Sequence, residues 1–237
     1  MSPQAGPLLL QRPIPGITDG HPKGYIRQVV IDGSILDYRY RLYGDININI
    51  NGDILRDGYD AWDHYETYDK LWQQYMLPGT VSRIAGKVTP ESLSTICLEN
   101  QFDLIICTAP RKAMCLRPGI HAFQSISVRV TERAEYPGQP DDTIIFNAGD
   151  WYGWVRSSRI FGHEVTEWLP GTDMGDNYPG GRIIQKPIST DCNCHPHVLF
   201  TGRFGAWRNE TWVDTAYYDT RSALISMARR DSWNGIR

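Results

Sequence analysis

The residues best suited to binding chemistry lie near the C-terminal end of the sequence, where a short apolar run is followed by a glycine-rich corner. Val198-Leu199-Phe200 predicts a strand, and it leads through Thr201-Gly202-Arg203-Phe204-Gly205 into a helix-like tail. A strand that turns into a helix presents free backbone N–H groups and a positive helix end. The guanidinium of Arg203 can bind phosphate or carboxylate through paired hydrogen bonds, and glycine lets a ligand approach the backbone. The corner therefore predicts an anion or cofactor site, with an ordinary turn carrying a surface arginine as an equally weighted alternative.

A cluster of thiols and imidazoles precedes this corner. Its members are Cys192, Cys194, His195 and His197. Zinc prefers such ligands, but structural zinc sites normally join two separated pairs, and no second C-x₂-C pair occurs in the sequence. The spacing therefore favours a loop that lines a neighbouring site over a metal site. Two further thiols, Cys107 and Cys115, have no histidine beside them in the sequence and are expected to be inert and buried.

A third set of chemical groups lies in the segment from Arg159 to Trp168, which predicts one continuous strand. In a regular strand Arg159, His163 and Glu167 share a face. His163 and Glu167 are then candidates for acid–base catalysis. The alternative is a solvated strand face that carries a salt bridge.

Composition limits the class of protein. The chain has 237 residues, of which 41% are hydrophobic and 22% charged, as in a globular domain with a sizeable core. A net charge of −3 argues against direct binding to nucleic acid or to a membrane surface. No apolar run approaches the roughly 20 residues that span a bilayer. The five cysteines are an odd number without a disulfide pattern, which favours a reducing, cytoplasmic location.

The periodicity predicts the elements that position these groups. We expect an extended lead-in over residues 1–24, followed by a single α+β domain over residues 25–237, in which a largely antiparallel sheet carries a few packed helices. An aromatic stripe predicts a helix over residues 59–76, and Thr89 with Pro90 marks the start of a second helix. Strands are predicted at 25–32, 38–43, 102–110, 124–130, 143–148, 151–156 and 159–168. Residues 46–52 predict an edge strand or a loop, and residues 170–181 a mobile loop.

Four motifs follow one another along the chain: FDLIICTAPRKAMC, WYGWVRSSRIFGHEVTEW, KPIS and HVLFTGRFGAWRNETWVDTAY. Their order resembles the C-terminal part of UDP-galactopyranose-mutase-like flavoproteins, which belong to the amine-oxidase-like FAD superfamily. The resemblance is greatest to the divergent members found in bacteriophages and actinobacteria. It implies the substrate-side and flavin-facing part of such a fold.

The resemblance also implies roles for individual residues. Arg203 would lie near the pyrophosphate and ribityl region of FAD, with Gly202 and Gly205 allowing close approach. The other residues on this cofactor surface would be Phe204, Trp207 and Asp214. Arg159 would bind the diphosphate of the substrate. Its neighbours in the substrate site would be Trp154 and Arg156.

No G-x-G-x-x-G follows an opening strand, although this motif holds the pyrophosphate in dinucleotide-binding folds. We therefore expect a split enzyme, in which a separate dinucleotide-binding subunit or a homo-oligomer completes the FAD site. Its substrate would be a phosphate-bearing small molecule, such as a nucleotide sugar or a modified nucleotide. The alternative is a non-enzymatic binding or assembly protein that keeps the scaffold without the cofactor, with aromatic residues at 59–76 and 151–154 as a partner surface. A zinc module built on residues 192–197 is a third hypothesis.

Overall fold

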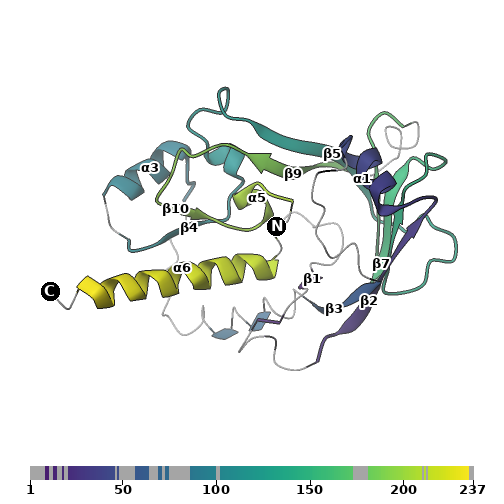
Figure 1. The fold of residues 1–237 in the computed structure, drawn as a ribbon, viewed down its shortest axis with the longest axis horizontal. Coiled ribbons are helices and arrows are strands. Elements are labelled where there is room, and N and C mark those ends of the chain that lie inside the picture. Colours follow the sequence, from purple (N-terminus) through teal and green to yellow (C-terminus); the bar gives the residue numbers. More distant parts are fainter. Residues whose placement is uncertain are drawn as a thin grey trace. The chain divides into compact units, whose positions relative to one another are not determined.

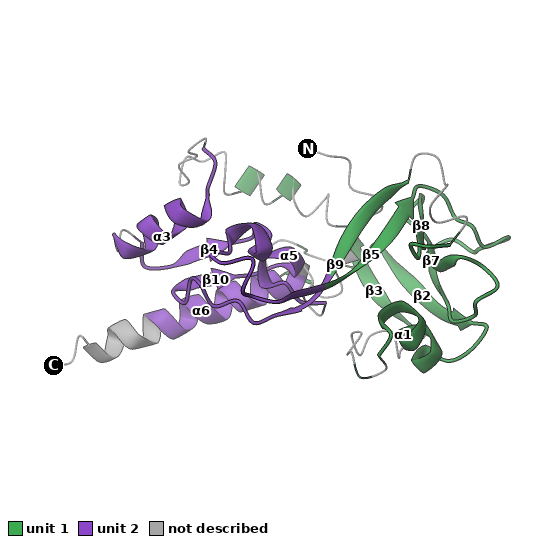
Figure 2. Cartoon of the chain, turned by 90° about the horizontal axis from the view of Figure 1, so that it is seen from above, with its two compact units in different colours: residues 1–78, 125–186 green, residues 79–124, 187–237 purple. Residues whose placement is uncertain are grey.

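The structure is a computed structural model. It describes residues 9–10, 13–14, 18, 21–45, 47, 57–63, 69–70, 73–74, 86–99, 102–172, 181–209, 211 and 213–234. The chain divides into two compact units, which are coloured separately in Figure 2. Unit 1 comprises residues 1–78 and 125–186, and unit 2 comprises residues 79–124 and 187–237. Each unit is thus assembled from two separate stretches of the chain.

A mixed sheet is the main feature of the fold (Figure 1). Its described strands are β1 (Leu9–Leu10), β2 (Gly24–Ile31), β3 (Gly58–Asp63), β5 (Phe123–Thr131), β6 (Thr143–Asn147), β7 (Trp154–Ile160), β8 (His163–Trp168) and β9 (Arg182–Thr190). They lie in the order β1-β3-β2-β6-β7-β8-β5-β9. β2 pairs with β6 in parallel, whereas β1–β3, β2–β3, β6–β7, β7–β8 and β5–β8 are antiparallel. The predicted class, α+β with a largely antiparallel sheet and a few helices, is confirmed at this level.

Unit 2 contains a smaller, parallel pair of strands and most of the helices. The pair consists of β4 (Ile105–Cys107) and β10 (Val198–Phe200). The described helices of the chain are α1 (Ile35–Tyr43), α3 (Pro90–Leu98), α5 (Arg203–Ala206), α6 (Val213–Asn234) and the 3₁₀ turn η3 (Arg111–Met114). The predicted start of α3 is confirmed, because the Thr89 hydroxyl accepts a hydrogen bond from the Ser92 N–H and Pro90 occupies the first turn.

The predicted strand over residues 38–43 is wrong, because these residues belong to α1. Ser34 caps the helix, and the Asp37 carboxylate accepts a hydrogen bond from the Ser34 N–H, which completes a capping box. Tyr38 and Leu42, four residues apart, are the buried residues of this helix. The alternation of aromatic and basic residues that suggested a strand is thus overridden by a local helix-start signal.

The predicted helix over residues 59–76 is wrong at its beginning. Residues 58–63 form β3, in which Tyr59 and Ala61 are buried at the two-residue spacing of a strand. Gly58 fits this strand because a Cβ there would lie 2.4 Å from the Ile26 carbonyl oxygen. Most of the remaining predicted helix, most of residues 46–52 and residues 173–180 lie outside the described residues.

The single strand predicted over residues 159–168 is also wrong. Phe161 and Gly162 have positive φ angles of 48° and 81°, and they form the two-residue turn between β7 and β8. Arg159 therefore faces Glu164 across the hairpin. The predicted strand over residues 102–110 shortens to the three residues of β4, and its Ile106 is 43% exposed, so this strand is not buried on both faces.

Each unit has its own core. In unit 1 the core lies against β2, β6, β7 and β8, and includes Ile26, Phe146, Val155 and Val165. In unit 2 a smaller buried cluster consists of Leu93, Cys107, Met114, Val198 and Phe200. Among the described residues, no helix combines the length and apolar character needed to cross a membrane.

Candidate functional site

The glycine corner follows the parallel pair β4–β10. Val198 pairs with Ile105 and Phe200 with Cys107, so both strands end at the same edge. The Thr201 N–H donates to the Cys107 carbonyl oxygen at 3.2 Å and extends the pairing by one residue. β4 then enters the turn at residues 108–110, and β10 enters the corner at residues 201–205. This edge is where ligands bind in sheets of parallel strands.

Two glycines shape the corner for different reasons. Gly202 has a φ angle of 74°, which favours glycine, and an added Cβ there would meet no atom within 4 Å. At Gly205 a Cβ would lie 2.9 Å from the Cys107 carbonyl oxygen and 3.3 Å from the Thr108 Cα. At Gly205 the backbone of α5 therefore packs closely against the end of strand β4.

The side chains of the predicted cofactor surface differ in burial. Arg203 is half-buried, and Phe204 is 43% exposed. Trp207 is buried, its indole N–H donates to the Gln124 carbonyl oxygen at 3.0 Å, and its ring contacts Phe123 edge to face at 5.4 Å. Asp214, in the first turn of α6, is almost completely buried. Of the predicted residues, Arg203 and Phe204 offer the accessible side chains, whereas Trp207 packs inside unit 2.

In unit 1, Arg159 is already engaged by neighbouring residues. Its guanidinium donates to Glu164 at 2.6 and 2.8 Å and to the Gln139 carbonyl oxygen at 2.9 Å, and lies 3.7 Å from Asp141. The backbone N–H of Ala134 and the guanidinium of Arg159 lower the pKa of Glu164. A diphosphate could reach Arg159 only by competing with these carboxylates.

The two predicted acid–base residues are not brought together. His163 is exposed at the beginning of β8, whereas Glu167 is 2% exposed near its end. Four residues of strand separate them by about 13 Å. The arrangement therefore does not support proton transfer between His163 and Glu167.

Glu167 is instead the centre of a buried charge cluster. One carboxylate oxygen lies 2.5 Å from Arg156, and the other forms an ion pair with Lys186 of β9, which is 6% exposed. Burial lowers the pKa of Arg156, but the charge of Glu167 outweighs it and holds this pKa above its ordinary value. The guanidinium of Arg156 is thus paired with Glu167 in this structure. Trp154, the other predicted neighbour in the substrate site, is buried against Ile145 and Trp168.

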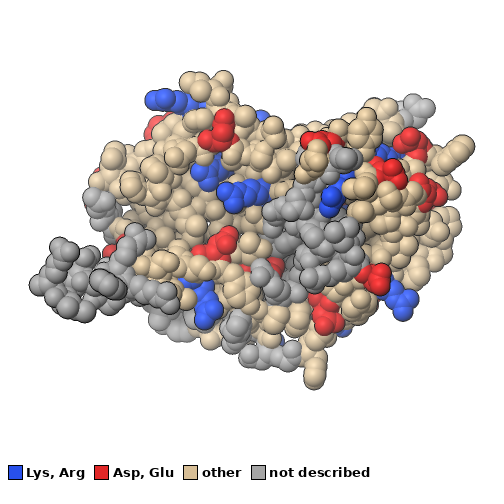
Figure 3. Space-filling model, viewed as in Figure 1, with Lys and Arg blue, Asp and Glu red and all other residues tan. Residues whose placement is uncertain are grey.

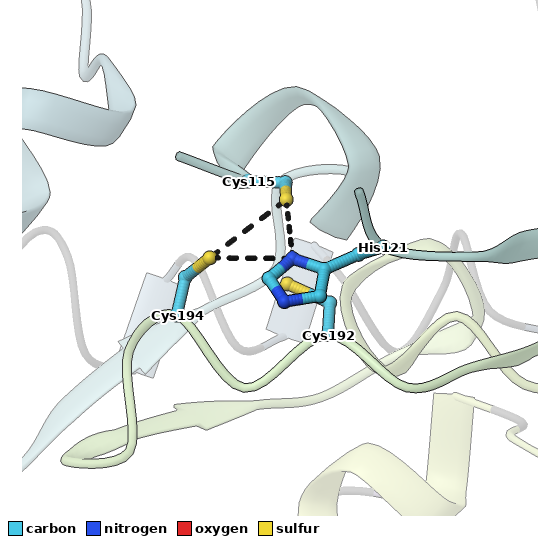
Figure 4. A group of neighbouring side chains, drawn as sticks. All are labelled: Cys115, His121, Cys192 and Cys194. Carbon is cyan, nitrogen blue, oxygen red and sulfur yellow. Dashed lines mark hydrogen bonds between the residues drawn. The ribbon is translucent and has the colours of Figure 1, made fainter. Parts of the chain in front are cut away.

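The folded chain brings together a different set of candidate metal ligands from the set suggested by the sequence. The ligand atoms of Cys115, His121, Cys192 and Cys194 all lie within 4.8 Å of one another. Figure 4 shows the three sulfur atoms gathered around the imidazole of His121. The Cys115 Sγ lies 3.2 Å from the His121 Nδ1 and 3.8 Å from the Cys194 Sγ, and the Cys194 Sγ lies 3.5 Å from the same nitrogen.

Two of the four candidate ligands considered in the sequence lie outside this cluster. His195 is buried, with its Nε2 2.8 Å from the Met114 carbonyl oxygen and its Nδ1 3.4 Å from the Ser94 hydroxyl. His197 is exposed. The missing second pair is Cys115 and His121. Cys115 is buried as expected, but the fold places its sulfur beside the imidazole of His121, a neighbour not identified from the sequence. The spacing Cys115-x₅-His121 is the sequence signal that could have revealed it.

The thiols of this cluster differ in their acidity. Burial raises the pKa of Cys115 to about 11, with the neighbouring thiols adding to the effect. Burial also acts on Cys194, but hydrogen bonds from the backbone of Leu116 and Arg117 and from the two other thiols outweigh it and lower its pKa. Backbone N–H groups thus favour a thiolate at Cys194.

On the face shown in Figure 3, basic and acidic residues are interspersed among other residues, which agrees with the small net charge. No protein-family model matches the sequence, and no curated protein or solved structure matches it.

Proposed function

We propose that this chain is the substrate-binding and flavin-facing portion of a FAD-dependent oxidoreductase or mutase-like enzyme. A separate dinucleotide-binding chain, or a second copy of this chain, completes the cofactor site. The substrate carries phosphate, as a nucleotide sugar or a modified nucleotide does. One observation carries the proposal: β4 and β10 run in parallel and end together beside Arg203.

The parallel pair supports this proposal because ligands bind beyond the carboxyl ends of such strands. Arg203 begins α5 and is separated from the end of β10 by two residues, and its planar guanidinium suits the diphosphate of FAD. The exposed ring of Phe204 offers an apolar surface beside that charge. FAD, when bound, supplies the redox or electrophilic chemistry. The residues of this chain bind and orient the anionic groups.

A titration with FAD tests this role of Arg203. The chain is mixed with its dinucleotide-binding partner, and flavin fluorescence is followed as FAD is added. Arg203→Ala should weaken binding about 10- to 150-fold, since a hydrogen bond to a charged group contributes about 1.5–3 kcal/mol. Arg208→Ala is the matched control, because Arg208 is exposed and lies five residues further along the chain, after the end of α5. Equal affinities of the two variants for FAD would reject the role of Arg203.

A binding or assembly function is the second candidate, and one loop of unit 1 favours it. Trp151 is 91% exposed and Tyr152 is 52% exposed. Arg41 of α1 holds this loop by donating to the carbonyl oxygens of Asn147 at 2.9 Å and Trp154 at 3.2 Å. Exposed aromatic side chains on an anchored loop suit a protein partner. Light scattering after size exclusion tests this function: assembly that Trp151→Ala abolishes supports it, and a monomer with no partner contradicts it.

A further inference from the structure

We propose that Cys115, His121, Cys192 and Cys194 bind one structural zinc ion in unit 2. Three sulfur ligands and one imidazole nitrogen form a donor set typical of structural zinc. Their ligand atoms already lie within 4.8 Å of one another. All four residues belong to unit 2, so the site is complete within one compact unit.

The distances agree with tetrahedral coordination. Zn–S bonds of about 2.3 Å and Zn–N bonds of about 2.0–2.1 Å place two sulfurs about 3.8 Å apart, and a sulfur and a nitrogen about 3.5 Å apart. The Cys115 and Cys194 sulfurs are separated by 3.8 Å, and they lie 3.2 and 3.5 Å from the His121 Nδ1. The Cys192 sulfur also lies within 4.8 Å of the other three ligand atoms.

Neighbouring groups hold the ligands in place. The Arg117 N–H donates to the Cys115 Sγ at 3.3 Å, as backbone N–H groups commonly do to metal-bound thiolates. The guanidinium of Arg111 donates to the Cys192 carbonyl oxygen at 2.7 Å and fixes the backbone at this ligand. The Ala122 N–H donates to the Asp191 carboxylate at 2.8 Å, which links the residue after His121 to the residue before Cys192.

The arrangement fits a structural ion better than a catalytic one or a disulfide. Four protein ligands fill a tetrahedral site and leave no position for a substrate. A disulfide needs sulfurs about 2.05 Å apart, whereas those of Cys115 and Cys194 lie 3.8 Å apart. Cys115 and His121 come from the first stretch of unit 2, and Cys192 and Cys194 from the second. The ion would therefore link the two stretches of unit 2. It would add to the stability of a unit whose buried apolar cluster is small.

Metal analysis of the purified chain tests the proposal. Inductively coupled plasma mass spectrometry should find one zinc per chain in the wild type and less than a tenth of that in His121→Ala. His197→Ala should retain one zinc, because His197 is exposed and outside the cluster. A second matched pair is Cys194→Ser, which should lose the ion, and Cys97→Ser, which should keep it.

Two measurements on the wild type keep the proposal testable if a ligand variant does not fold. Replacement of zinc by Co²⁺ should give the intense visible bands of tetrahedral cobalt with thiolate charge-transfer bands. Removal of the ion by a chelator should accelerate amide exchange in residues 111–121 and 191–200 and leave β6–β8 unchanged. The proposal is overturned by stoichiometric iron in place of zinc, by a Cys115–Cys194 disulfide, or by a wild type that neither contains zinc nor takes it up.

Discussion

The substitution Glu167→Gln removes the carboxylate that pairs with both Arg156 and Lys186 in the buried charge cluster of unit 1. Glu167 lies between Arg156 and Lys186, and the side chains of Glu167 and Lys186 are 3% and 8% exposed. After the substitution Arg156 and Lys186 keep their charge but lose the ion pair with Glu167. Breaking a buried ion pair from one side costs about 3–5 kcal/mol. Since Arg156 is 31% exposed and partly solvated, we expect the low end of this range, about 3 kcal/mol.

The matched control is Glu164→Gln on the same strand. Glu164 pairs with Arg159, and the two side chains are 37% and 34% exposed, so solvent screens this pair and its loss should cost much less than the loss of Glu167. The assay is urea unfolding combined with amide exchange of β7 and β8, which reports on unit 1 alone. If Glu167→Gln costs no more than Glu164→Gln, the charge cluster is solvated and the reasoning fails. The double substitution with Lys186→Met should recover part of the loss, because it removes one uncompensated cation.

Three further predictions concern other parts of the molecule. The side-chain and backbone hydrogen bonds of Ser34 lower the pKa of Asp37, so its stabilisation of α1 is present above the unfolded pKa of about 3.9 and is lost as pH falls through the lower folded pKa. Thermal unfolding of the wild type from pH 6 to 2 should show this loss of stability, and the Asp37→Asn variant should lack the part that comes from Asp37. A pH profile of the variant identical to that of the wild type would contradict the prediction. Gly205→Ala should destabilise unit 2 by about 1–3 kcal/mol in urea unfolding, because its Cβ would meet the Cys107 carbonyl oxygen at 2.9 Å. A stability equal to that of the wild type would mean that α5 and β4 separate easily. Chelation of zinc should lower the melting temperature of the wild type but not that of the His121→Ala variant, and an equal effect on both would exclude the site.

Some elements could be predicted because their signals are local. Thr89 with Pro90 marks the start of α3, and Val198–Phe200 with the following glycines marks β10 and its corner. The error at α1 shows the reverse: the alternation of residues 38–43 predicts a strand, whereas the capping box formed by Ser34 and Asp37 starts a helix there. The hairpin between β7 and β8 was missed because its turn uses Phe161, a residue that rarely adopts a positive φ angle.

The cysteine–histidine cluster could not be predicted as a whole from the sequence. Cys115 and His121 lie far from Cys192 and Cys194 along the chain, and only the folded unit brings them together. The Thr190 hydroxyl donates to the Ala122 carbonyl oxygen at 2.7 Å and shows where the two stretches meet. Lys186 was missed for the same reason, since nothing local in its motif indicates a partner on β8.

The absorbance spectrum of the purified chain, taken alone and after mixing with a candidate dinucleotide-binding chain, tests the proposed function most directly. If the proposal is right, the complex is yellow, shows the two visible bands of bound flavin and contains one FAD. A complex that forms but stays colourless after incubation with excess FAD would contradict it.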